Sequence, residues 1–114
     1  MKQTKTTDYT LCPKFEKAFS ILGKKWNGLI IDVLLEKSPQ RFSELKQQIP
    51  MLSDRVLVER LKELEAEGII TKAARCNESS RLEYFLTDKG LDLQLAMKQI
   101  KVWAEKWADT EDCG

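Results

Sequence analysis

The sequence predicts one mainly helical α+β domain, and three observations predict it. The chain has 114 residues, which is enough for a single domain with one modest core. Hydrophobic residues make up 42% and charged residues 32%, the balance of a soluble globular protein. Apolar residues recur at helical spacing along most of the chain, but they alternate over part of the stretch 69–86. We therefore expect a set of helices interrupted by one β-hairpin.

The composition limits the chemistry that this domain can perform. The chain contains no His, which removes Ser-His and Cys-His nucleophile pairs and His-ligated metal sites. No two of Cys12, Cys76 and Cys113 have Cys-x-x-Cys spacing, and there is no glycine-rich phosphate loop. We therefore expect no metal, no cofactor and no enzymatic activity.

The distribution of apolar residues also predicts where the protein resides. No apolar run is long enough to span a membrane, and the first ten residues lack the apolar segment of a secretory signal. We therefore expect a cytoplasmic protein without a membrane partner, in which the three cysteines are free thiols by default.

The first third of the chain predicts a flexible arm and two helices. The arm covers residues 1–11, and Cys12-Pro13 opens a helix, because proline suits the first helical position. This helix ends at Gly23, and its apolar stripe consists of Phe15, Ala18, Phe19 and Leu22. A second helix is expected over about residues 24–37, ended by Ser38-Pro39. Its expected buried face consists of Trp26, Leu29, Ile30, Val33 and Leu34.

The middle of the chain predicts two further helices. A short link over residues 40–41 leads to a helix over about residues 43–48, with Ser43 as its expected cap. Ser53 is expected to cap a fourth helix over about residues 54–67, ended by Gly68. The core stripe of this fourth helix is Leu57, Leu61 and Leu64.

The last third predicts a hairpin and a long helix. Residues 69–75 and 81–86 are expected strands, joined by a turn over residues 77–80. Thr87 is expected to cap one helix over about residues 88–108, followed by a flexible tail over residues 109–114. The domain as a whole is expected over residues 12–108.

This order of elements is that of a winged helix-turn-helix with a two-stranded wing. In that fold the fourth helix enters the major groove of DNA with its first turns. The residues of this helix that face away from the leucine stripe are Asp54, Arg55, Val58, Glu59 and Lys62. Arg55 is suited to guanine or phosphate and Val58 to a thymine methyl group. The alternative is an ordinary solvated face with ion pairs along the helix.

Two other surfaces carry a functional prediction. In the hairpin, Lys72, Arg75 and Arg81 flank a tip with two serines, which suits contact with phosphates or a minor groove; the alternative is an ordinary exposed hairpin. The last helix is more apolar than a core of this size can cover, so we expect it to mediate dimerisation rather than fold back on its own core. Its candidate interface residues are Leu95, Val102, Trp103 and Trp107.

Cys12 is the cysteine with the strongest case for reactivity. It lies at or next to the start of the first helix and is followed by Lys14 and Lys17. A helix N-terminus and nearby cations stabilise a thiolate, which is the form that reacts with oxidants and electrophiles. The alternative is a buried, inert cysteine.

Four motifs carry a family resemblance that covers the chain from about Cys12 to the middle of the last helix. They are Cys12-Pro13, the Gly-Lys-Lys-Trp of residues 23–26, the Arg-Leu-Lys-Glu-Leu-Glu of residues 60–65, and the Tyr-Phe-Leu-Thr-Asp-Lys-Gly of residues 84–90. In this combination the sequence resembles the HxlR-type, MarR-like winged helix-turn-helix regulators. Within that family it is most similar to the branch that senses quinones and thiol stress.

The resemblance implies a homodimeric transcription repressor that binds palindromic operator DNA and releases it on reaction with an oxidant or electrophile, such as a quinone or diamide. The sensing thiol of that branch corresponds to Cys12. In some members a C-terminal thiol of the partner subunit bridges to it, and Cys113 is the candidate here; alkylation of Cys12 alone is the alternative. A regulator without thiol sensing, responding to a non-covalent ligand or to none, and a protein-interaction module both remain open.

The predicted DNA contacts combine the fold and the resemblance. Lys24 and Lys25, at the expected start of the second helix, are candidate phosphate contacts helped by the helix N-terminus. Arg60 and Lys62 are expected to support base contacts or to touch phosphate. The remaining candidates are Ser53, Asp54, Arg55, Val58 and Glu59 on the fourth helix, and Arg75, Ser79, Ser80 and Arg81 in the wing.

Overall fold

A computed structural model describes residues 10–75 and 78–109, with the backbone only for residues 75 and 78–81. Its elements, in chain order, are α1 (Pro13–Leu22), α2 (Asn27–Glu36), β1 (Gln40–Arg41), α3 (Phe42–Gln48), α4 (Asp54–Ala66), β2 (Ile70–Arg75), β3 (Glu78–Leu86), α5 (Asp88–Leu91) and α6 (Gln94–Trp107). Within these described ranges, no helix is long and apolar enough to cross a membrane. Most of the predicted arm and tail falls outside these ranges.

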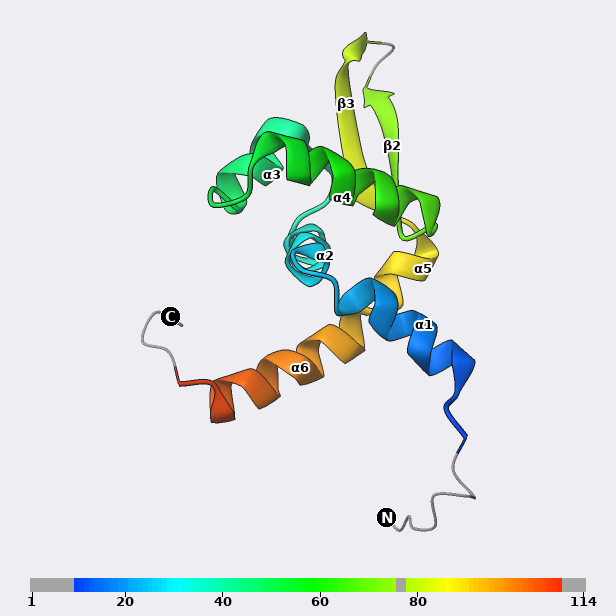
Figure 1. Ribbon diagram of the computed structural model, residues 1–114. Helices are drawn as coiled ribbons and strands as arrows, with labels where there is room; N and C mark the ends of the chain where they lie inside the picture. Colours follow the sequence, from blue (N-terminus) through cyan, green and yellow to red (C-terminus); the bar gives the residue numbers. More distant parts are fainter. Residues whose placement is uncertain (1–9, 76–77, 110–114) are drawn as a thin grey trace.

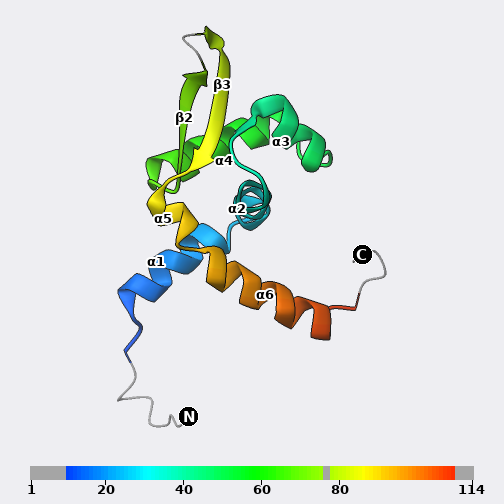
Figure 2. The same cartoon turned by 180° about the vertical axis from the view of Figure 1, so that it is seen from behind.

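The elements form two layers (Figures 1 and 2). One layer contains α2, α3, α4 and the sheet, and its hairpin of β2 and β3 projects away from the rest of the molecule. The other layer contains α1 and α6, which meet below α2 and run outwards in different directions. No residue of α1 or α6 is fully buried. The core therefore belongs to the first layer, and α1 and α6 lie outside it.

The core is built around the predicted leucine stripe of α4. Leu57, Leu61 and Leu64 are all buried, which confirms that prediction. The other buried apolar residues come from α2, α3, the α3–α4 connection, the α4–β2 connection and the sheet, and they are Ile30, Ile31, Leu34, Leu45, Ile49, Leu52, Ile69, Ile70 and Leu86. For α2 the prediction was wrong at one position, because Leu29 is 49% exposed and Ile31 is buried instead. Apolar residues surround most of α2, so spacing alone did not identify its inner face.

The sheet has three strands, in the order β1-β3-β2, and all pairs are antiparallel. The predicted hairpin is confirmed, but residues 78–80, which were expected in its turn, belong to β3. The predicted link over residues 40–41 is in fact β1, in which Gln40 faces Tyr84. Gln40 is buried, and its Nε2 donates to the carbonyl oxygens of Val33 at 3.2 Å and Lys37 at 2.7 Å, at the end of α2.

The predicted caps were correct at two helices and wrong at a third. The Ser53 hydroxyl accepts from Val56 N–H at 3.2 Å, and the Thr87 hydroxyl accepts from Gly90 N–H at 3.2 Å. Ser43 is not a cap, because α3 begins one residue earlier, at Phe42, with Arg41 as the N-cap residue. There Glu44 accepts from the Arg41 N–H at 2.8 Å, as in a capping box.

The predicted last helix is two helices, α5 and α6, separated by Asp92 and Leu93. Gly90 explains this geometry, because a Cβ atom there would collide with the main-chain oxygen of Ile69. The close approach packs α5 against the end of the sheet, and α6 then leaves in a new direction (Figure 1). The single helix expected over residues 88–108 was therefore wrong, since a local pattern does not reveal this contact.

Candidate functional site

Helix α4 presents one face to solvent, and most of the predicted DNA-binding residues lie on it. Ser53 and the outward-facing side chains of Asp54, Arg55, Val58, Glu59 and Lys62 are exposed. They occupy the first turns of the helix, next to its N-terminus, where the helix dipole favours an anion. This arrangement fits insertion of the first turns of α4 into a major groove.

Lys46 on α3 is a cation that the sequence analysis did not include in the site. Its Nζ donates to the Pro50 carbonyl at 3.2 Å and lies 4.0 Å from the carboxylate of Asp54. The two helices of the motif therefore place Lys46 beside the N-terminus of α4. The only signal in the sequence was its position in the last turn of a short helix.

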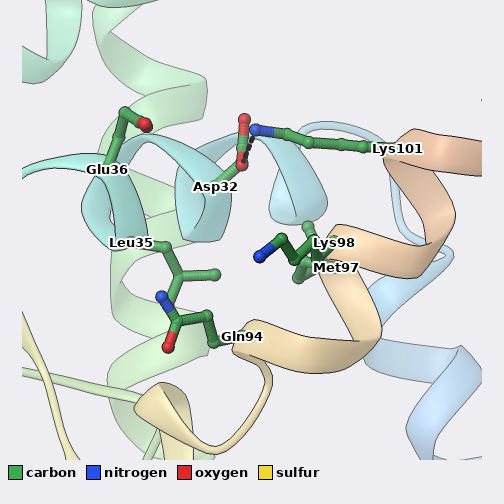
Figure 3. A pocket seen from close by; sticks show the side chains of 7 residues that line it. All are labelled: Asp32, Leu35, Glu36, Gln94, Met97, Lys98 and Lys101. Atoms are coloured by element: carbon green, nitrogen blue, oxygen red, sulfur yellow. Dashed lines mark ion pairs between the residues drawn. The ribbon is translucent and has the colours of Figure 1, made fainter. Parts of the chain in front are cut away.

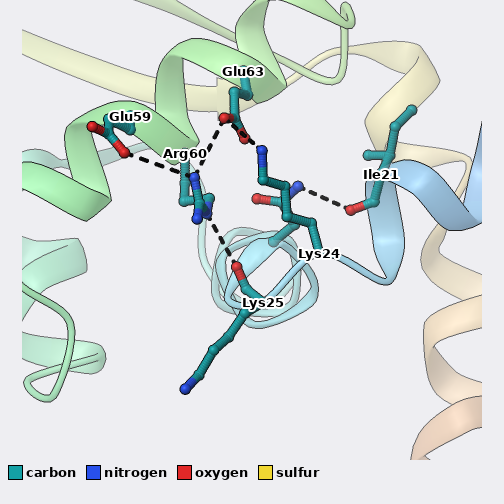
Figure 4. Close-up of polar contacts among 7 residues, drawn as sticks. Ile21, Lys24, Lys25, Glu59, Arg60 and Glu63 are labelled. Atoms are coloured by element: carbon teal, nitrogen blue, oxygen red, sulfur yellow. Dashed lines mark hydrogen bonds and ion pairs between the residues drawn. The ribbon is translucent and has the colours of Figure 1, made fainter.

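Arg60 points away from the exposed face of α4, unlike the other predicted contacts (Figure 4). Its side chain is 16% exposed, and its Nε donates to the Lys25 carbonyl at 3.2 Å. Its Nη1 lies 3.3 Å from Glu63, and the Lys24 Nζ lies 2.9 Å from the same carboxylate oxygen. Arg60 and Lys24 are therefore engaged within the chain.

Lys24 and Lys25 precede α2, so the prediction that they open this helix was wrong. The helix begins at Asn27, and its N-cap residue Trp26 has a φ of 81°, in the left-handed region. The Lys25 ammonium lies over the Trp26 ring, 5.0 Å from its centroid. This turn displaces the lysines from the helix N-terminus that was expected to help them bind phosphate.

The backbone of the wing places its predicted contacts within strands. Arg75 ends β2, while Ser79, Ser80 and Arg81 lie in β3, with an irregular register between Ala74 and Arg75. Their side chains, and all of Cys76, lie outside what the structure describes. The wing contacts therefore stay predictions.

Cys12 is an exposed free thiol at the N-cap position of α1. Cys12 is therefore not buried, as the alternative had assumed, and its reactivity stays a prediction. Cys113 lies outside the described residues. In the described part of the chain, no three His, Cys, Asp or Glu residues are grouped as a metal site would need.

An exposed apolar surface covers α1 and α6. On α6 the candidate interface residues Leu95, Val102, Trp103 and Trp107 are all exposed, with Trp103 at 64%. On α1, Phe15 and Phe19 are exposed as well, and their rings meet edge to face at 4.9 Å. Several large exposed apolar side chains gathered on two helices are typical of an interaction surface.

Helix α6 is attached to α2 at its inner side (Figure 3). Lys101 Nζ lies 2.8 Å from Asp32 Oδ1, across a hollow of about 260 Å³ that Leu35 and Met97 also line. The hydrogen bond from Lys101 to Asp32 raises the pKa of the Lys101 ammonium above its ordinary value. Leu93 and Met97 pack against the core from the start of α6.

This arrangement has matches among known proteins. The family model of the HxlR-like helix-turn-helix matches residues 21–112, most of the chain. The chain belongs to the HxlR family. It is therefore a transcription regulator of a helix-turn-helix type, which implies DNA binding, and HxlR proteins are regulators rather than enzymes. The resemblance drawn from the sequence motifs and the winged-helix fold class are both confirmed.

Individual HxlR-family relatives are also similar over nearly their full length. The transcriptional regulator YodB of Bacillus subtilis is 45% identical over 103 residues, which are 90% of this chain and 91% of YodB. The reduced form of YodB superposes with a TM-score of 0.77, at 44% identity over 88% of this chain and 97% of that one. The redox regulator HypR in its oxidised form has a TM-score of 0.77, at 31% identity over 87% of this chain and 100% of that one.

Proposed function

We propose that this chain is a homodimeric repressor that releases operator DNA when an oxidant or electrophile modifies Cys12. The observation that carries the proposal is the position of the Cys12 thiol. It is exposed at the start of α1, and α1 together with α6 forms the exposed apolar surface. A change at Cys12 would therefore act on α1, one of the two helices on which we expect a second subunit to pack.

The relatives support a response to electrophiles and oxidants. Structures of YodB include a quinone-bound form, 45% identical to this chain, and a diamide-treated form, 43% identical. HypR is a redox regulator with reduced and oxidised structures. The same class of inducer, a quinone or a thiol oxidant, is the one that an exposed thiol would detect.

The chemistry needs no cofactor. The Cys12 thiolate adds to a ring carbon of a quinone and a C–S bond forms. The attacked carbon then loses its proton, and the two carbonyl oxygens become hydroxyls with that proton and one from solvent, which gives a hydroquinone thioether. With diamide, two thiols lose two electrons and two protons to the N=N bond, which yields a disulfide and a hydrazine. Cys113 of a second subunit is the candidate second thiol, and the quinone adduct requires Cys12 alone.

Release of DNA then follows from the geometry of a dimer. Two recognition helices must fit successive major grooves, roughly 34 Å apart, on a palindromic site. A rotation of one subunit against the other breaks this fit while each domain stays folded. A hundredfold loss of affinity needs only about 2.7 kcal/mol of differential stabilisation.

The test compares the wild type with Cys12→Ser, and Cys76→Ser is the matched control. The probe is a duplex that the reduced wild-type protein selects from random DNA, and binding is measured by fluorescence anisotropy before and after benzoquinone or diamide. We expect Cys12→Ser to bind like the wild type when reduced and to stay bound after treatment, whereas Cys76→Ser releases normally.

Two results would contradict the proposal. If the reduced wild type selects no sequence at physiological salt, the chain is a protein-interaction module instead. If Cys12→Ser releases DNA as readily as the wild type, the chain is a winged-helix regulator without thiol sensing at Cys12. A Cys113→Ser variant separates the two switches, because it should lose a diamide-induced intersubunit disulfide and keep release by the quinone.

A further inference from the structure

The C-terminal half of α4 is tied by charge to α1 and to the connection between α1 and α2. Glu63 Oε2 lies 2.9 Å from Lys24 Nζ, and Glu67 Oε2 lies 3.1 Å from Lys17 Nζ. Lys17 is in α1, and Lys24 lies two residues after the end of that helix. Glu63 and Glu67, at the C-terminal end of α4, therefore face this junction, while the candidate DNA contacts occupy the first turns and the opposite face of the helix.

The connection between α1 and α2 is short and conformationally restricted. Gly23–Trp26 joins the helices, and Trp26 adopts a left-handed φ of 81°, which is unfavourable for a bulky side chain. Arg60 donates from α4 to the Lys25 carbonyl, which belongs to the peptide bond directly before Trp26. Arg60 of α4 therefore holds the peptide bond that directly precedes the left-handed residue Trp26.

Asn27 connects the same junction to α1. It is 2% exposed, and its Nδ2 donates to the Ile21 carbonyl in the last turn of α1 at 2.9 Å. In the described part of the chain, its Oδ1 and Glu63 Oε1 are buried acceptors without a donor. Both residues also line one hollow of about 210 Å³ between α1, α4 and the start of α2.

We propose that Lys24, Asn27, Arg60 and Glu63 form a positioning cluster, with Glu63 at its centre, that sets the orientation of α4 relative to α1 within one subunit. Figure 4 shows Arg60 and Glu63 of α4 meeting Lys24 and the Lys25 carbonyl in the connection between α1 and α2. Given the proposed function, a displacement of α1 by modification at Cys12 reaches the DNA-binding face of the same subunit through this cluster, as well as through the partner.

The charge of Glu63 makes the proposal testable, because electrostatics and positioning predict opposite changes in DNA affinity. Glu63→Gln keeps the shape of the side chain and makes the chain one charge more positive, so simple electrostatics predicts equal or tighter DNA binding. Loss of positioning predicts the opposite, an operator Kd raised about five- to tenfold. Glu65→Gln is the matched control, because among the described residues Glu65 pairs with Lys72 of β2, at 3.8 Å, and not with α1 or α2.

A second variant changes Lys24, the partner of Glu63, instead of Glu63 itself. Lys24→Met removes the partner of Glu63 at a site where the side chain is 45% exposed, so folding is expected to survive. A lost phosphate contact would reduce the slope of log K against log salt by about one, whereas a positioning residue leaves the slope unchanged. Lys24→Met and Glu63→Gln should also be non-additive, since each breaks the same contact.

The same variants test the link to α1. In the wild type we expect quinone to raise the operator Kd about a hundredfold, and in Glu63→Gln by less than about tenfold, because α4 no longer follows α1. The inference is wrong if Glu63→Gln and Lys24→Met both keep the operator affinity, the salt slope and the quinone-induced release of the wild type. If the wild type itself fails to release DNA, the proposed function is wrong, and the affinities of the reduced variants still decide whether Glu63 positions α4.

Discussion

Helices α4 and α6 are similar in sequence pattern and opposite in burial. They contain 13 and 14 residues, and each has an apolar side at helical spacing. Helix α4 buries Leu57, Leu61 and Leu64 against α2, α3 and the sheet, whereas α6 buries no residue completely. The comparison teaches that periodicity predicts which side of a helix is apolar and leaves open what covers it.

The largest effect that can test this contrast is a leucine truncation in each helix. Leu61→Ala removes a buried side chain and should lower the free energy of unfolding by about 2–5 kcal/mol. Leu95→Ala, on the exposed side of α6, should change the unfolding of the isolated subunit by less than about 0.5 kcal/mol. Urea denaturation at low protein concentration measures both, and equal losses would show that α6 packs on its own core.

The next effect concerns association. Trp103→Glu places a charge on the exposed apolar surface and should weaken dimerisation by about 2 kcal/mol or more, roughly thirtyfold, while the fold of each subunit is retained. Sedimentation at several concentrations measures it, and Glu105→Gln on the same helix is the control. A wild-type chain that sediments as a monomer at micromolar concentration would refute the assignment of α6 to an interface.

The smallest effect concerns the ion pair that fastens α6 to α2. Asp32 raises the pKa of Lys101 above 10.5, so the pair stabilises the folded chain at neutral pH and is lost as pH rises through the raised pKa. Because Lys101 is largely exposed, Asp32→Asn should cost at most about 1 kcal/mol near pH 7. Denaturant midpoints between pH 7 and about pH 11 measure this. If the midpoints of Asp32→Asn and the wild type differ as much at the highest pH as at pH 7, the ion pair is not the cause of the difference.

Much of the fold was predictable because it depends on local chemistry. Ser53 and Thr87 cap helices through hydrogen bonds to residues three positions along, and Gly68 supplies a φ of 78° after α4. The leucine stripe of α4 was predictable for the same reason, since three- and four-residue spacing places its members on one side of a helix. The exposed residues of its other side follow directly, from Arg55 to Lys62.

Other features depend on residues distant in the chain. Gln40 and Arg41 form a strand because β3 pairs with them, and Gly90 is required because the Ile69 carbonyl lies against it. Neither partner is recognisable from a local pattern. The α5–α6 break and the true start of α2 at Asn27 were missed for this reason.

The candidate site divides in the same way. The sequence by itself determined that α4 carries an exposed face of mixed charge with one apolar residue at its first turns, that Cys12 opens a helix, and that the last helix has more apolar surface than the core can cover. Only the tertiary structure decided that Arg60 and Lys24 turn inwards to Glu63, because long charged side chains follow the charges and carbonyls that packing brings near them. Helix spacing sets the direction of a Cα–Cβ bond, whereas the end of an arginine or lysine is directed by neighbours that only the fold assembles.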